Sequence, residues 1–257
     1  MDSTFSTYTL ISKNLTRTLE MTQKEPVVAR ETKYYEENIG NIKSIDDFVG
    51  DTRIFNYAMK AFGLEDMAYA KAFMRKALEG GVEDKKSFAN RLNDDRFVQF
   101  VTTFNFAAKG EAVTASSDVK KPVVDKYVRQ TLEVTEGADN EAVRLALYFQ
   151  RAAPDVKSVY GLLADAALTE VVKTVFNLPT EMSSADIDRQ AKTIEKLLDV
   201  ADLQDPAKLD KLIKRFAVMY DAQNFVATSP ILQLFADNGY ATSLDLSMTI
   251  MNLKHGG

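Results

Sequence analysis

The sequence contains no cysteine and no tryptophan, and its only histidine, His255, lies in the closing LKHGG. Without cysteine the chain can form no disulfide, thiol nucleophile or cysteine-based metal site. With one histidine, we expect no catalytic dyad or triad that uses histidine as base, and no zinc site built from several histidines. The sequence therefore predicts no metal, no cofactor and no enzymatic activity.

Strong charge and long apolar runs are also missing. The net charge of the 257 residues is only -5, and the basic residues form no stripe of the kind that binds nucleic acid. No run approaches the roughly 18 consecutive apolar residues of a membrane-spanning helix. The opening MDSTFSTYTLISKNL lacks the apolar core of a cleavable secretion signal. We therefore expect no nucleic-acid partner, no membrane span and a cytoplasmic location.

The composition that remains is typical of a helix-rich globular protein. Hydrophobic residues make up 46% and charged residues 27%, and there are only six prolines in the chain. Apolar side chains recur at helical spacing through most of the sequence, so the pattern predicts an all-α fold.

The two ends of the chain differ from this pattern in ways that suggest contact with another protein. The first helix is expected over 9–21, with its apolar face formed by Leu10, Ile11, Leu15 and Leu19. Near the other end, polar residues alternate with Leu244, Leu246, Met248 and Ile250. This period of two is typical of a strand or of a tail that docks in extended form. Both sets of residues are predicted partner contacts.

The central feature is a repeat of residues 30–64 at 144–178, without a gap. The identical pairs are Arg30/Arg144, Tyr34/Tyr148, Lys43/Lys157, Ser44/Ser158, Asp51/Asp165, Phe62/Phe176 and Leu64/Leu178. Because the identities keep helical spacing, we interpret the repeat as a duplicated helical module with these pairs as structural positions.

Local signals in the two copies favour structural over chemical roles. Ser44 is followed three residues later by Asp47, which resembles a capping box, and Gly63 follows the last helical turn. Lys-Ser at 43–44 and 157–158 has no preceding glycine-rich loop, so a helix cap is favoured over a phosphate site. For the paired arginines and tyrosines we expect salt bridges and core packing.

The repeat suggests a division of the chain. We predict one helical module over 1–108, a degenerate copy over 118–225, and a docking segment over 226–257. The small, polar stretch at 109–117, KGEAVTASS, is the predicted linker. The sequence leaves open whether the two modules share one compact core, and it does not indicate an oligomeric state.

The segments YTLISKNLTRTLEMT and SIDDFVGDTRIFNYAMKAFGLEDMAYAKAFM, within Thr7–Gly81, carry a family resemblance. They resemble the DUF1217 family of uncharacterised helical proteins, found mainly in alphaproteobacteria. In the second copy the AFGLED piece has become VFNLPT, so the resemblance there is weaker.

Several members of that family lie in flagellar gene clusters. The resemblance therefore implies a flagellum-associated structural, assembly or accessory protein that acts through protein contacts, located in the cytoplasm or at the flagellum. The alternative is a cytoplasmic helical chaperone or regulatory binding module unrelated to the flagellum. The family supplies no catalytic residue to carry over.

Overall fold

The computed structural model describes residues 3–92 and 94–228. Every regular element in these ranges is helical and none is a strand, so the predicted all-α class is confirmed. The predicted contacts at Leu244, Leu246, Met248 and Ile250 lie outside the described residues.

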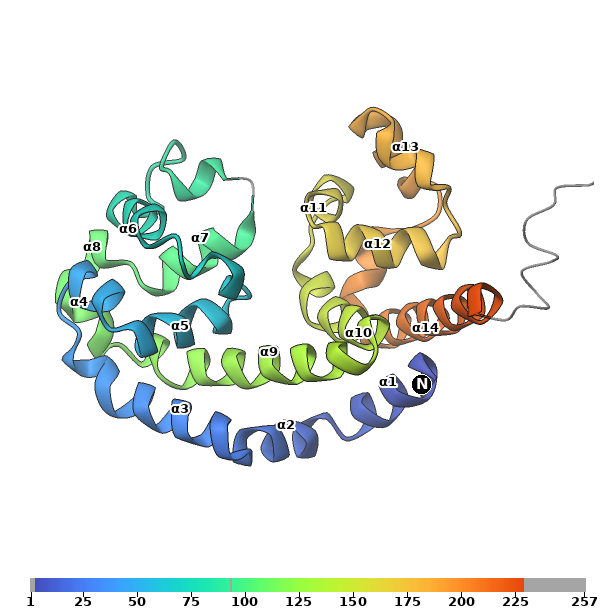
Figure 1. Cartoon of the computed structure of the whole chain (residues 1–257). Coiled ribbons are helices and arrows are strands. Elements are labelled where there is room, and N and C mark those ends of the chain that lie inside the picture. Colours follow the sequence, from blue (N-terminus) through green and yellow to red (C-terminus); the bar gives the residue numbers. More distant parts are fainter. Residues whose placement is uncertain (1–2, 93, 229–257) are drawn as a thin grey trace, which may run out of the picture.

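The elements divide between two lobes, connected by α2 (Leu15–Lys24) and α9 (Lys121–Asp139) (Figure 1). The first lobe contains α3 (Pro26–Asn38), η1 (Ile39–Asn41), α4 (Ile45–Gly50), α5 (Thr52–Ala61), η2 (Glu65–Met67), α6 (Lys71–Gly80), η3 (Ala89–Arg91), α7 (Asp95–Thr103), α8 (Phe106–Lys109), η4 (Gly110–Ala115) and η5 (Ser117–Val119). The second contains α1 (Thr4–Lys13), α10 (Glu141–Ala152), η6 (Ala153–Asp155), α11 (Val159–Ala164), α12 (Ala166–Val175), η7 (Thr180–Ser184), α13 (Ile187–Glu195), η8 (Val200–Gln204) and α14 (Pro206–Thr228).

The core of the first lobe is built from aromatic rings. Phe48 on α4 is fully buried, and its ring centroid lies 4.7 Å from that of Phe104 and 5.8 Å from that of Phe55. Phe100 and Phe106 complete the cluster around it. Tilted and edge-to-face pairs of this kind add stability beyond the apolar area that they bury.

The second lobe has a core that is largely aliphatic. Leu147, Leu162, Val172 and Ile213 are fully buried there, on α10, α11, α12 and α14. The two lobes therefore have separate hydrophobic clusters with different side-chain chemistry.

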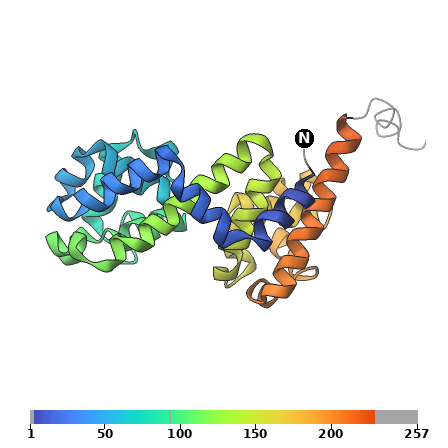
Figure 2. The ribbon, with the colours of Figure 1, turned by 90° about the horizontal axis from the view of Figure 1, so that it is seen from below.

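The connection between the lobes is a pair of helices rather than a loop. The first half of α9 contributes Val123 and Val128 to the first core, and Leu132 on the same helix belongs to the second. Helix α2 packs against α9, and Leu19 on α2 contacts both clusters (Figure 2). A continuous helix supported by a second helix holds the lobes in a fixed relation.

The linker predicted over 109–117 is wrong. Most of this stretch forms η4, in which Val113 and Thr114 are fully buried in the first lobe. The hydroxyl of Thr114 donates to the carbonyl oxygen of Ile42 at 2.7 Å. A small, polar composition suggested a loop, but one valine and one satisfied threonine were enough to anchor the segment.

Helix α1 packs against α10 and α14 of the second lobe, although the prediction grouped it with residues 1–108. Its first turn is capped from a distance by the Asp221 carboxylate, which accepts from Ser3 Oγ at 2.7 Å and from the backbone N–H of Thr4 at 3.0 Å. The remaining boundaries of the two predicted modules stay a prediction.

The local geometry of the first lobe recurs 114 residues later in the second. Helix α4 corresponds in length and position to α11, and α5 to α12. Both pairs end at a left-handed residue, Gly63 with φ 67° and Asn177 with φ 47°. An origin by duplication stays a prediction, but the recurrence of cap, helix and stop is a structural finding.

Candidate functional site

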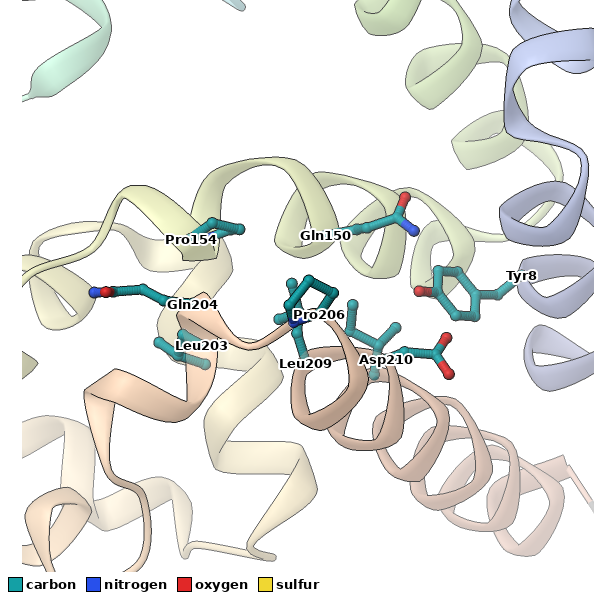
Figure 3. Close-up of a pocket in the computed structure, with 9 residues that line it drawn as sticks. Tyr8, Gln150, Pro154, Leu203, Gln204, Pro206, Leu209 and Asp210 are labelled. Atoms are coloured by element: carbon teal, nitrogen blue, oxygen red, sulfur yellow. The ribbon is translucent and has the colours of Figure 1, made fainter.

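The first candidate site is a partly open pocket in the second lobe between α1, α10, η6, η8 and α14 (Figure 3). Its volume is about 270 Å³. It is lined by Tyr8, Gln150, Pro154, Leu203, Gln204, Pro206, Leu209, Asp210 and Ile213. Aliphatic side chains and two proline rings form most of the wall, and the polar groups at one end come from three different helices.

Tyr8 is the notable member of this polar end. Its side chain is 0% exposed, and its hydroxyl makes no hydrogen bond of ordinary geometry with a described residue, although the Ser12 side chain one turn later is near enough to lower its pKa. Burial raises the pKa of this hydroxyl above its ordinary value, and the nearby Asp210 carboxylate raises it further. The phenol is therefore protonated at neutral pH and presents an O–H donor toward the pocket.

The other two polar groups at this end have partners of their own. Gln150 Oε1 accepts from the Arg129 guanidinium at 3.1 Å, which leaves the amide nitrogen of Gln150 as a donor. The Asp210 carboxylate accepts from Lys214 Nζ at 2.6 Å on the same helix. Two donors and one carboxylate acceptor thus converge near the ring of Tyr8.

A buried charged cluster lies behind this wall, on α9 and α10. Glu133 is 1% exposed, and its carboxylate accepts from Arg129 Nε at 2.9 Å and from Arg151 at 2.8 Å. Arg129 also donates to the backbone carbonyl of Leu147 at 2.6 Å. Buried charges need such pairing, so the cluster is fully occupied in holding α9 to α10. The spacing of Arg129 and Glu133 in the sequence could have indicated their pairing, but nothing local indicates the second arginine.

A second, more open depression lies between α11, α13 and η8 of the second lobe, with a volume of about 490 Å³. It is lined by Ser158, Val159, Tyr160, Glu195, Leu198, Asp199 and Val200. The Tyr160 hydroxyl donates to the Asp188 carboxylate at 2.8 Å, which links α11 to α13 beside the depression.

In the part of the chain that the structure describes, neither hollow is lined by three acidic, histidine or cysteine side chains of the kinds that ligate metal ions. Within residues 3–92 and 94–228, no three acidic or histidine side chains gather as metal ligands would. No helix in the same ranges is long and apolar enough to cross a membrane.

The DUF1217 family, described as proteins of unknown function, matches residues 61–209. This chain belongs to that family. The match covers the second copy, where the resemblance seen in the sequence was weaker, and it overlaps Thr7–Gly81 only from residue 61 onward.

A solved structure agrees with this assignment. The crystal structure of an Agrobacterium tumefaciens protein, a structural-genomics target, is 52% identical and superposes with a TM-score of 0.80. The similarity covers 86% of this chain and 94% of that one. No curated protein matches the chain.

The predicted contact residues of this DUF1217 protein at its N-terminal end face in different directions. Leu10 is 68% exposed, whereas Ile11 is buried in the second core. Leu15 and Leu19 are partly buried against the cores. The apolar face that was expected to contact another protein is thus mostly covered by the chain itself, and only Leu10 remains open.

The predicted repeat positions occupy matching local sites. The Tyr34 hydroxyl donates to Asp51 Oδ2 at 2.9 Å, and the Tyr148 hydroxyl donates to Asp165 Oδ2 at 2.5 Å. The other oxygen of each aspartate caps the following helix. Each of these carboxylates therefore caps one helix and fixes it to the tyrosine of another.

The serines and the remaining pairs also serve the scaffold. Ser44 and Ser158 cap α4 and α11 through their side-chain oxygens. Phe62 is buried, and its ring lies beneath Lys126 Nζ at 5.3 Å, while Phe176 is half-buried with Arg215 over it at 5.4 Å. Arg30 and Arg144 are exposed ion-pair partners of Glu31 and Glu141.

Proposed function

We propose that this DUF1217 protein is a non-enzymatic protein of the flagellum, with a structural, assembly or accessory role exerted through protein contacts. The flagellar part rests on the sequence resemblance to a family with members in flagellar gene clusters. The contact part rests on one surface of the second lobe.

That surface surrounds the 490 Å³ depression. Tyr160, which lines the depression, is 48% exposed. Two further exposed apolar side chains adjoin its surroundings in sequence: Ile187 at 51%, next to the Tyr160 partner Asp188, and Leu197 at 44%, next to the lining residue Leu198. Exposed apolar groups that gather beside a hollow are typical of protein-binding sites.

The first lobe supports this interpretation by contrast. The position of Tyr160 is taken there by Asp46, which forms an ion pair with Arg75. The chain between α6 and α9 then supplies Phe97, Phe100 and Phe104 to the first core. Between α13 and α14 the second lobe has only η8, so within the described residues that connection supplies no aromatic layer of this kind.

The experiment begins with deletion of the gene in its host, scored by swimming in soft agar and by microscopy of filaments. We expect reduced swimming. Missing filaments would indicate a role in assembly or export, and intact filaments a role in the motor. Unchanged swimming would contradict the flagellar role.

The contact surface is tested by complementation. A triple variant, Tyr160→Ala with Ile187→Ala and Leu197→Ala, should fail to restore swimming, although all three side chains are exposed and their loss should leave the fold intact. The matched control is Met21→Ala with Val27→Ala and Tyr69→Ala, which removes three apolar side chains that are still more exposed and lie elsewhere, and it should restore swimming. Full rescue by the first variant would remove this face from the proposal.

A further inference from the structure

The pocket beneath α1 ends at a buried hydroxyl that no described residue satisfies (Figure 3). We propose that it is a binding site for a small neutral molecule that carries an amide and a branched aliphatic group. Tyr8 donates to the carbonyl oxygen of that amide.

The hydroxyl of Tyr8 is buried without a partner among the described residues, as are those of Thr9, Ser87 and Thr131, but two other buried tyrosines are paired. The buried hydroxyl of Tyr35 donates to the carbonyl oxygen of Val119 at 2.6 Å, and that of Tyr57 pairs with Thr32 at 3.0 Å. A buried donor without an acceptor destabilises a fold, so such exceptions call for a reason. The Tyr8 side chain borders a hollow, but its hydroxyl has no surface open to water, so an acceptor reaches it only when a ligand displaces the side chains at the edge of the pocket.

The polar groups beside Tyr8 indicate which functional group of a ligand would supply that acceptor. The amide nitrogen of Gln150 is a second donor, because its oxygen is already bonded to Arg129. The Asp210 carboxylate is an acceptor. A ligand that satisfies this end therefore needs both an acceptor and a donor. A secondary amide offers the two on adjacent groups of fixed geometry.

The charges favour a neutral ligand. Asp210 is paired with Lys214, and Arg129 with Glu133. An anion would meet the carboxylate of Asp210, and a cation would compete with Lys214 for it. Neither an added negative nor an added positive charge finds a free counter-charge here.

The rest of the pocket selects an aliphatic group of modest size. Leu203, Leu209 and Ile213 are buried side chains that line it, together with the rings of Pro154 and Pro206. The volume of about 270 Å³ lies at the lower end of the range for ligand pockets, about 300–1,000 Å³. Ordered water could occupy the same space, and the test separates that outcome from the proposal.

The probe is N-acetyl-L-leucine-N′-methylamide, titrated into the full chain while the methyl signals of Ile213 are followed by NMR. For a ligand of about 13 heavy atoms at ordinary ligand efficiency we expect saturation with a Kd of ~1 mM. N-acetyl-L-leucine, which replaces the second amide by a carboxylate, should bind at least about tenfold more weakly.

Tyr8→Phe removes only the hydroxyl and should weaken the neutral probe by about tenfold. Because that hydroxyl bonds to no described residue, the variant should melt no lower than the parent protein. Tyr160→Phe is the matched control, since its hydroxyl binds Asp188 outside the pocket, and should leave the Kd unchanged. Should Tyr8→Phe fail to fold, Asp210→Leu removes the acceptor at the edge of the pocket and should weaken binding about fivefold.

Absence of saturable shifts at about ten times the expected Kd would overturn the proposal and leave a water-filled pocket. Equal binding by the parent and Tyr8→Phe would overturn it as well. These outcomes are independent of the flagellar role, because they need no partner protein and no motility.

Discussion

The two lobes share a scaffold but differ in what covers it. In both, a capped short helix leads through an aspartate into a second helix that stops at a left-handed residue. In the first lobe the chain between α6 and α9 adds an aromatic layer, whereas the second lobe is completed by α1 and α14. The shared parts set local geometry, and the differing parts decide which surfaces remain open.

From this difference between the lobes we expect the functional surface to lie on the second lobe. The first lobe buries most of its aromatic side chains, with Tyr69 as an exposed exception, while the second lobe has both of the hollows described above. The same helical scaffold thus occurs twice: in the first lobe an aromatic layer packs against it, and in the second lobe the described residues leave hollows beside it.

The largest effect should come from the cores. Phe48 and Leu162 occupy the same position in the two copies, and both are fully buried. We expect Phe48→Ala to lower the free energy of unfolding by about 4 kcal/mol and Leu162→Ala by about 3 kcal/mol. Denaturant unfolding followed by circular dichroism measures both. A larger loss for Leu162→Ala would contradict the view that the first lobe depends more on its aromatic centre.

The shared scaffold predicts equal effects at its two aspartates. Asp51→Ala and Asp165→Ala each remove a helix cap and an acceptor for a tyrosine, so each should cost about 2 kcal/mol of stability. Tyr34→Phe and Tyr148→Phe remove only the hydroxyl contact and should cost about 1 kcal/mol each. A difference of more than about 1 kcal/mol between the two aspartates would show that the copies are not energetically equivalent.

The cap on α1 should make the second lobe sensitive to acid. Burial alone would raise the pKa of Asp221, but hydrogen bonds from Thr4, Ser3 and Phe5 outweigh it and hold the pKa below its ordinary value. Because the folded pKa is lowered, this stabilisation is present above the unfolded pKa of about 3.9 and is lost as pH falls through the folded pKa.

Hydrogen exchange of the α1 amides at decreasing pH measures this effect. Protection should fall below about pH 4 in the parent protein. Asp221→Asn should cost about 1 kcal/mol at neutral pH and should lack the acid step that Asp221 supplies. If protection of the α1 amides fell over the same pH range in Asp221→Asn, the loss of protection would belong to another carboxylate.

The smallest effects are expected at the left-handed stops. An added Cβ at Gly63 would meet its nearest atom only at 3.7 Å, so Gly63→Ala should cost about 1 kcal/mol through backbone strain alone. Asn177→Gly should instead stabilise the second lobe by about 0.5 kcal/mol. Thermal melting of both variants measures the difference, and a loss of stability in Asn177→Gly would show that the bond which Asn177 Oδ1 accepts from Gln223 at 3.4 Å outweighs the relief of backbone strain.

Sequence alone was sufficient where the determinants are local. The caps at Ser44 and Ser158 and the stop at Gly63 depend on residues within one or two turns, and all are found in the structure. The buried stretch around Thr114 was missed because its hydroxyl bonds to Ile42, which is 72 residues earlier.

The candidate pocket could not be predicted for the same reason. Its walls come from α1, α10, η6, η8 and α14, which are brought together only by the tertiary fold. Tyr8 has no neighbours in sequence that indicate burial of its hydroxyl. A pattern can show that a tyrosine lies on a helix but not that its hydroxyl lacks an acceptor.

The distant cap on α1 also sets an order of events during synthesis. Thr4 and the carboxylate that caps it are separated by 217 residues. At ordinary translation rates, on the order of 5–20 residues per second, α1 is made roughly 10–40 s before Asp221. Throughout that interval Tyr8 and Ile11 lack the α14 side chains that later cover them, so the first helix to be made is among the last to reach its native place.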